Sequence, residues 1–151
     1  MTVNQISIFL ENKYGKLADI FSLLASADIR VVATTVADTS EFGILRIIVS
    51  EPHKAYKILK EANVSANLTE VFALQIDNTA ASLAQVLQQI TQKGISVEYI
   101  YCFSHKEQSM LILRTNNESA TRDAIRSNNL VAISENELIN MGSSNSSQKY
   151  F

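Results

Sequence analysis

Apolar and polar residues alternate along the start of the chain. Over residues 3–11 the apolar positions recur every second residue, with Ile6, Ile8 and Leu10 on one face, which predicts a β-strand. After this strand the apolar residues recur at helical spacing, at Leu17, Ile20, Phe21 and Leu24. This change of period predicts an amphipathic helix, so the chain begins with a strand that leads into a helix.

The next segments extend this arrangement. Residues 29–37 are rich in β-branched side chains and predict a second strand, and a polar turn leads into a third strand over residues 43–50. Pro52 suits the first turn of a helix that ends at Ala62. Residues 64–68 close the series as a strand. The order of these elements is βαββαβ.

The same pattern returns, without a gap, when the sequence is aligned with itself so that Ile29 coincides with Ile95. At this repeat offset Asn63 also coincides with Asn129. The second copy predicts strands over residues 71–77, 95–104, 109–115 and 130–134, and helices over 83–93 and 119–128. The sequence therefore predicts an α+β protein of two ferredoxin-like βαββαβ units in tandem, each an antiparallel sheet with its helices on one face, packed side by side.

No flexible linker separates the two copies. Because residues 64–77 are too many for one ordinary strand, we expect a bend near residues 67–70. This places the first unit at residues 1–69 and the second at 70–140. Residues 141–151 are rich in serine and asparagine and lack periodicity, so we expect a disordered tail.

Composition narrows the class of protein. A hydrophobic content of 46% can form a core, and the net charge of -2 provides no basic excess for nucleic acid or anionic lipid. No apolar run is long enough to span a membrane, and the single cysteine excludes an internal disulfide. We expect a soluble, cytoplasmic protein without nucleic-acid or membrane partners.

Residues suited to catalysis or metal binding do not converge in the sequence. His53 and His105 lie in separate segments that we expect to be exposed, and Cys102 lies in a predicted strand, where we expect a buried, inert thiol. The open face of the predicted sheets carries one aromatic residue, Phe9, in the strands where RNA-binding sheets place their stacking platforms. We therefore expect no enzyme activity, metal, cofactor or RNA binding.

The loop between the first strand and the first helix has the sequence "ENKYGKL". A βαββαβ unit with an acidic-Asn-x-x-Gly-x-Leu stretch after its first strand resembles an ACT domain, and the doubled pattern over residues 3–140 resembles proteins made of two ACT domains in tandem. The resemblance implies a free amino acid as ligand, bound at interfaces between ACT units, and a regulatory role in amino-acid metabolism.

The resemblance also implies which residues form the ligand loop: Asn12, Lys13, Tyr14, Gly15, Lys16 and Leu17. Amides at a helix start attract a carboxylate, and glycine lets a ligand approach the main chain closely. Tyr14 stands where the family usually has proline, and the second copy has Ala80 and Ala81 in place of Pro-Gly, which favours the first loop as the functional site. Alternatively, Gly15 only forms a turn with positive φ, Asn12 only shapes the entry to the helix, and the lysines are solvated.

A second group of candidates lies on the strand "VEYIYCF" of the second copy. By the same resemblance, Glu98 could balance an amino group, while Tyr99 and Tyr101 could line a side-chain pocket. The alternative is that the tyrosines pack against neighbouring strands and Glu98 is simply exposed.

These observations favour a non-catalytic regulatory or sensor protein that binds an amino acid. The alternative is a protein–protein interaction or dimerisation module whose ligand loops have decayed. A set of apolar residues on the predicted helix-free face argues for a homodimer: Phe9, Ile44, Ile48, Val71, Met110 and Ile112. A metabolic enzyme is a further expected partner.

Overall fold

The chain divides into two compact units, each with its own core. The computed structural model describes residues 1–11, 15–38 and 42–141. We call N-terminal unit residues 4–69 together with 139–141, and C-terminal unit residues 1–3 and 70–138. The boundary therefore falls inside a strand, between Thr69 and Glu70.

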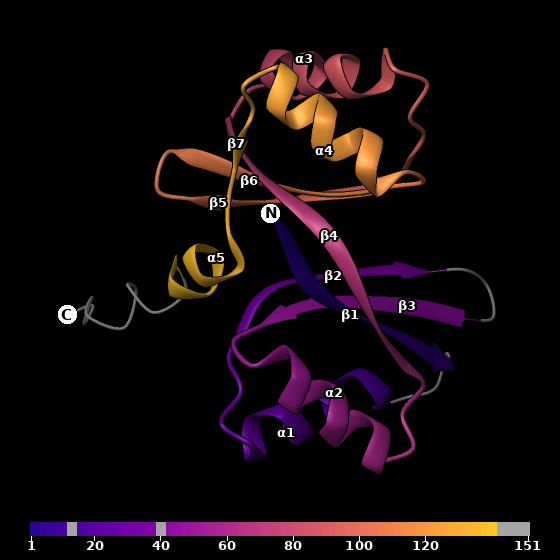
Figure 1. Cartoon of the computed structure of the whole chain (residues 1–151). Coiled ribbons are helices and arrows are strands. Elements are labelled where there is room, and N and C mark those ends of the chain that lie inside the picture. Colours follow the sequence, from indigo (N-terminus) through magenta and orange to yellow (C-terminus); the bar gives the residue numbers. More distant parts are fainter. Residues whose placement is uncertain (12–14, 39–41, 142–151) are drawn as a thin grey trace. The chain divides into compact units, whose positions relative to one another are not determined.

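The N-terminal unit is an antiparallel sheet with two helices on one face (Figure 1). Its elements are β1 (Thr2–Glu11), α1 (Lys16–Ser26), β2 (Val31–Asp38), β3 (Phe42–Val49), α2 (Pro52–Glu61) and the start of β4 (Ala66–Asp77). The strand order is β2-β3-β1-β4, and Ile8 of β1 lies opposite Leu45 of β3.

The core of this unit lies between the sheet and its two helices. The side chains of Ile6 and Ile8 are inaccessible to solvent, and the fully buried Leu24 and Leu59 belong to α1 and α2. Ile6, Ile8 and Leu10 belong to this one cluster, so the predicted face of the first strand is confirmed. Alternation sends every second residue of a strand to the same face, which is why the prediction succeeds.

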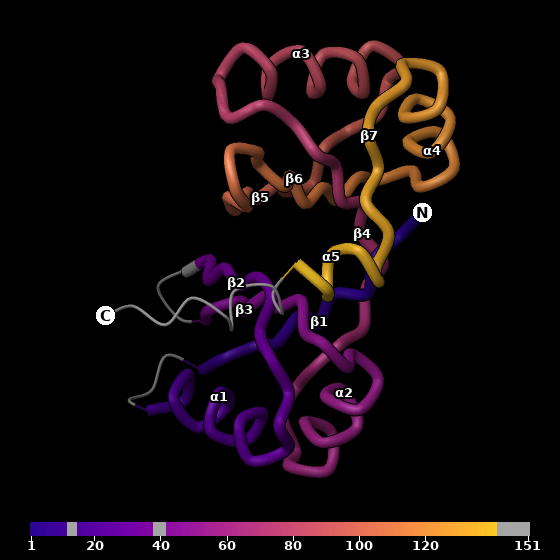
Figure 2. Tube along the Cα trace, turned by 90° about the vertical axis from the view of Figure 1, so that its left-hand side faces the viewer, coloured from indigo at the N-terminus to yellow at the C-terminus, as the bar shows by residue number. Residues whose placement is uncertain are grey.

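The C-terminal unit repeats this architecture, and α3 and α4 again share one face of its sheet (Figure 2). Its elements after β4 are α3 (Ala80–Thr91), β5 (Val97–His105), β6 (Gln108–Thr115), α4 (Glu118–Ser127), β7 (Val131–Ala132) and α5 (Glu135–Met141). The strand order is β7-β4-β6-β5. Phe72, Leu74 and Ile76 join Val86 and Ile90 of α3 in a second core.

The backbone repeats as well as the pattern of apolar residues. Asp28 and Gly94, which coincide at the repeat offset, both have positive φ, at 57° and 73°. Asn63 and Asn129, which also coincide, have φ of 59° and 53°. Each of these residues follows a helix of its unit, where a left-handed residue ends the helix. The predicted α+β fold of two βαββαβ units is confirmed.

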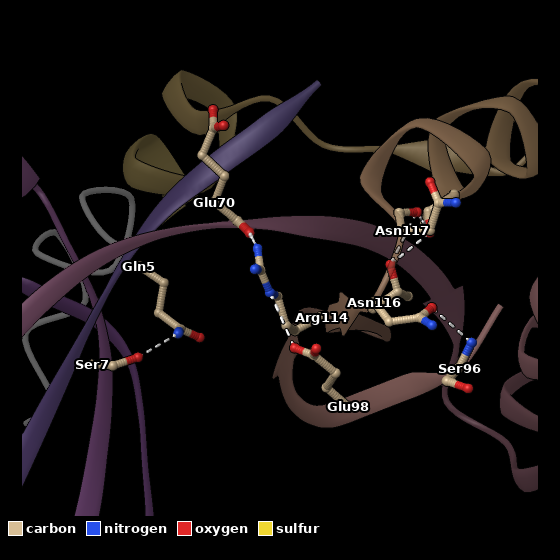
Figure 3. Close-up of polar contacts among 10 residues, drawn as sticks. Gln5, Ser7, Glu70, Ser96, Glu98, Arg114, Asn116 and Asn117 are labelled. Carbon is tan, nitrogen blue, oxygen red and sulfur yellow. Dashed lines mark hydrogen bonds and ion pairs between the residues drawn. The ribbon is translucent and has the colours of Figure 1, made fainter.

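A bridge between the second and third strands recurs at the same offset. In the N-terminal unit the amide of Ser50 donates to the carbonyl of Arg30 at 2.9 Å, and the Ser50 hydroxyl accepts from the amide of Arg30 at 3.0 Å. In the C-terminal unit Asn116 and Ser96 form the same pair of bonds at 3.1 and 3.0 Å, and Figure 3 shows the bond between the Asn116 side chain and the Ser96 amide. The equivalent positions thus keep the bridge although their side chains differ.

The segment between the two copies differs from the prediction. Residues 66–77 form a single strand of 12 residues, β4, where we expected two strands separated by a bend. The first part of β4 is the last strand of the N-terminal unit, and the rest is the first strand of the C-terminal unit. The sequence pattern could not show this, because one strand can pair with different partners along its length.

A further helix, α5, follows β7 where the sequence analysis expected none. The hydroxyl of Ser134 accepts from the amide of Glu137 at 3.3 Å, and the Glu137 carboxylate accepts from the amide of Ser134 at 2.8 Å. This is a capping box, and the S-x-x-E spacing of "SENE" was the signal for it. These bonds hold the pKa of Glu137 below its ordinary value. The predicted tail began at residue 141, but Met141 is the last residue of α5, and residues 142–151 lie outside the described residues.

Candidate functional site

Gly15 lies at the start of α1 in the left-handed conformation. Its φ is 80° and its ψ is -6°, and its carbonyl accepts from the amide of Asp19 at 2.9 Å to close the first helical turn. A Cβ atom at this position would meet no other atom within 4 Å. The positive φ, rather than a lack of space, is therefore what favours glycine here.

A cavity of about 450 Å³ lies beside this helix start, within the N-terminal unit. Sites for small ligands usually have volumes of about 300 to 1,000 Å³, so its size suits a small molecule. Its lining consists of Phe9, Leu10, Glu11, Lys16, Ile20, Phe42, Ala62, Asn63, Val64 and Ser65. Lys16 is the residue of this set that the sequence analysis proposed for the ligand loop.

Three parts of the chain that are distant in sequence converge on the cavity: the end of β1 with the first part of α1, Phe42 of β3, and residues 62–65. The end of β1 and the start of β3 meet because Glu11 lies opposite Phe42 in the sheet. The connection from α2 to β4 is fixed by the left-handed Asn63 and by a hydrogen bond from the Phe9 amide to the Ser65 carbonyl at 3.0 Å. Each contact joins segments that the sequence does not bring together, so the sequence analysis missed these lining residues.

The lining combines charged and apolar groups. Lys16 provides an ammonium group and Glu11 a carboxylate, while Phe9 and Phe42 are 48% and 52% exposed. The side chain of Ile20 is buried in the core of the unit and adds to the apolar part of the lining. A ligand with an anionic end, a cationic end and an apolar part would find a complementary group for each part.

The corresponding loop of the C-terminal unit is built differently. Helix α3 begins at Ala80, three residues before the predicted start, and Ala81 lies within its first turn. The hydroxyl of Thr79 caps this helix by accepting from the amide of Ser82 at 3.1 Å. Because Thr79 caps the helix early, the position equivalent to Gly15 is helical and needs no left-handed residue.

A smaller cavity of about 270 Å³ lies next to this second loop. It is lined by Ile76, Asp77, Asn78, Thr79, Ala80, Leu83, Cys102 and Ser109, and the Ser109 hydroxyl donates to the side-chain oxygen of Asn78 at 3.1 Å. The residue equivalent to Lys16 is Ser82. Among the described lining residues of this cavity no cation is present, which distinguishes it from the larger one.

Cys102 corrects one expectation of the sequence analysis. It was expected to be buried, but it is exposed and lines the smaller cavity. It lies on β5, the last strand in the order β7-β4-β6-β5, so within its unit one side of the strand lacks a neighbour among the described strands. The surrounding protein still raises the pKa of the thiol by desolvation, which keeps it protonated and poorly nucleophilic at neutral pH.

The second group of predicted site residues lies on β5 of the C-terminal unit. The Glu98 carboxylate is 3.3 Å from Nε of Arg114, whose Nη1 donates to the carbonyl of Glu70 at 2.8 Å (Figure 3). Tyr99 and Tyr101 lie on the helix-free face, opposite Arg114 and Ile112. Cys102 is the β5 residue that lines the smaller cavity, so the structure does not bring this predicted group to the cavity of its own unit.

The remaining predicted residues belong to the first loop. Asn12, Lys13 and Tyr14 lie outside the described residues. Leu17, in the first turn of α1, is exposed. Within residues 1–11, 15–38 and 42–141 no three His, Cys, Asp or Glu side chains are grouped as a metal site would require. Over the same ranges no helix has the length and apolar character that a membrane crossing needs.

Comparisons with known proteins place the chain in a family. The sequence profile of the family described as "ACT domain pair" matches residues 1–142. The crystal structure of protein BT0572 from Bacteroides thetaiotaomicron superposes with a TM-score of 0.87 at 34% sequence identity, covering 92% of this chain and 96% of that one. A search of curated proteins found no match.

More distant structures share the fold. The ligand-free regulatory subunit of aspartate kinase from Thermus thermophilus has a TM-score of 0.56 at 21% identity, with 82% of this chain and 91% of that chain covered. The regulatory subunit of aspartate kinase from Thermus flavus has a TM-score of 0.58 at 19% identity, with 82% and 90% covered. At these identities the likeness concerns the fold.

Proposed function

The chain belongs to the ACT domain pair family, and we propose that it is a non-catalytic regulatory protein that binds a free amino acid in its N-terminal unit. Regulatory subunits of aspartate kinase share its fold, which makes a regulatory role plausible on structural grounds. A cytoplasmic location suits a protein that responds to free amino acids.

The observation that carries this proposal is the cavity beside Gly15. Its lining provides Lys16 for an α-carboxylate, Glu11 for an α-ammonium group and an apolar wall for a side chain. The left-handed Gly15 supports it further, because it leaves the amides of the first helical turn without a side-chain cap from the N-cap residue. Asn12, Lys13, Tyr14 and Leu17 remain proposed members of the ligand loop.

A role for the β5 residues is a weaker part of the proposal. Glu98 has a partner in Arg114, so binding an ammonium group there would compete with an existing ion pair. Tyr99 and Tyr101 remain candidates for contact with a ligand from the helix-free face.

We further propose that the protein acts as a homodimer and regulates a metabolic enzyme. The apolar face expected from the sequence does not support this, because Ile48, Val71, Met110 and Ile112 are buried within the described chain. Instead, Val31 and Val36, exposed apolar residues of the edge strand β2, support an association surface in the N-terminal unit. Edge strands with exposed apolar residues are common sites of association between chains.

A thermal-shift screen over the common amino acids tests the proposal. We expect at least one free amino acid to raise the melting temperature in a saturable manner. If no amino acid stabilises the protein and calorimetry detects no binding, the ligand-binding function is wrong. An interaction module with decayed loops would then be favoured.

A further inference from the structure

We infer that the amino acid bound in the N-terminal unit has a large apolar side chain, with aromatic side chains bound most tightly. The inference rests on the proposed function and adds the class of ligand. It depends on three observations: the exposed phenylalanines of the cavity, the two charged groups among its described lining residues, and the contrast with the equivalent positions of the second copy.

The phenylalanines form an apolar wall. Phe9 lies opposite Ile44, and Phe42 lies opposite Glu11, so Phe9 and Phe42 are diagonal neighbours on one face of β1 and β3. Both line the cavity, and about half of each side chain is exposed. Covering this surface with an apolar ligand removes it from water, and an aromatic ring gains further from edge or stacking contacts with the two rings.

The described lining carries one charged group for each end of an amino acid. Among the described lining residues Lys16 and Glu11 are the charged ones, and a zwitterion engages both. Asn63 and Ser65 are neutral, and the Ser65 carbonyl already accepts from the Phe9 amide at 3.0 Å. A charged ligand side chain that lay against the apolar wall would lose hydration there, which is unfavourable.

The second copy shows what these positions look like without an apolar wall. The residues equivalent to Phe9 and Phe42, at the repeat offset, are Gln75 and Gln108. Nε2 of the Gln75 side chain donates to Oε1 of the Gln108 side chain at 3.5 Å, so the polar pair can be accommodated between these two strands. The same pair of positions is therefore apolar beside the larger cavity and polar in the other unit.

This contrast supplies a matched substitution. Replacing Phe9 and Phe42 together by glutamine installs the pair that the fold already tolerates in its other unit. Val131→Gln is the control, because Val131 is 55% exposed on β7 and lies outside the described lining of the cavity. Phe42→Leu tests whether apolar character alone is sufficient, and melting temperatures without ligand confirm that each variant is folded.

The experiment is isothermal titration calorimetry of the full chain with phenylalanine, tyrosine, leucine, alanine, aspartate and lysine. We expect phenylalanine to bind at least tenfold more tightly than alanine and than either charged amino acid. We expect the double glutamine variant to lose about tenfold in affinity for phenylalanine, the upper range of a lost aromatic contact, with less change for Val131→Gln.

Three results would overturn the inference in distinguishable ways. If alanine, aspartate or lysine binds as tightly as phenylalanine, the ligand class is wrong while the amino-acid-binding function stands. If the double variant binds phenylalanine as the wild type does, the apolar wall is not the binding surface. If no amino acid binds, the proposed function fails and the inference fails with it.

Discussion

Gly15 and Ala81 occupy equivalent positions in the two copies but have different backbone conformations. Gly15 is left-handed with φ of 80° and precedes α1, whereas Ala81 lies inside the first turn of α3. Left-handed residues do recur at the repeat offset in two other places, at Asp28 and Gly94 and at Asn63 and Asn129. The two strand-to-helix loops therefore differ in conformation, while the turns that follow the helices are equivalent.

This difference predicts unequal effects of valine in the two loops. We expect Gly15→Val to abolish amino-acid binding, because a β-branched residue strongly disfavours a φ of 80° and the loop must rearrange. We expect Ala81→Val to retain most of the binding, because valine in a helix costs only about 0.6 kcal/mol relative to alanine. Calorimetry measures both affinities. Tight binding that survives Gly15→Val but disappears in Ala81→Val would reverse the assignment of the loops.

Ligand binding itself should stabilise the wild type measurably. At a ligand concentration of a hundred times Kd, binding contributes about 2.7 kcal/mol to the free energy of unfolding. For a chain of this size we expect a rise in melting temperature of about 5 to 10 °C. Differential scanning fluorimetry detects this shift, and Gly15→Val should abolish it.

Lys16 should contribute to affinity through the ligand's carboxylate. We expect Lys16→Met to weaken amino-acid binding by about 10- to 100-fold, the usual worth of a hydrogen bond to a charged group. Lys54→Met is the matched control, because Lys54 lies on α2 of the same unit outside the described lining of the cavity. Calorimetry with the amino acid and with the matching amine, which lacks the carboxylate, shows whether the loss of affinity depends on the carboxylate. Equal loss for both compounds would show that Lys16 does not contact the carboxylate.

The cap of α3 should be a property of the Thr79 hydroxyl. We expect Thr79→Ala to lower the free energy of unfolding by about 1 kcal/mol, because the Ser82 amide then loses its acceptor. Thr79→Ser should retain most of the stability, since serine keeps the hydroxyl group. Urea denaturation measures both variants. A loss in the serine variant as large as in the alanine variant would point to packing of the methyl group instead.

The capping box of α5 should depend on pH. The pKa of Glu137 is lowered in the folded protein by its bonds to Ser134, so its stabilising effect is present above the pKa of an unfolded glutamate. The effect is lost as the pH falls through the lower folded pKa. We expect the amides of α5 to exchange faster in Glu137→Gln than in the wild type at pH 7, and the difference to vanish in strong acid.

Hydrogen exchange measured by NMR checks this prediction. Glu107→Gln is the control, because Glu107 is an exposed residue in the turn before β6. A wild type and a Glu137→Gln variant whose α5 amides exchange at the same rate at every pH would show that the carboxylate does not hold the helix start.

Some features of this protein were determined by the sequence alone. Ile8 and Leu74 face their helices because a strand alternates its side chains, a local rule that requires no knowledge of the partner strand. The internal repeat gave the order of elements in both units, and the need for a left-handed residue made Gly15 conspicuous. Each of these properties can be read from the order of residues along the chain.

Other features were decided only by the tertiary structure. Glu11, Phe42 and Asn63 meet at one cavity because strand pairing and the α2–β4 connection bring distant segments together, and no local pattern encodes that meeting. β4 continues from one unit into the other because it pairs with both β1 and β6. Cys102 is exposed because β5 is an edge strand of its unit. Local periodicity sets which face a residue takes, whereas long-range pairing sets which residues share a site.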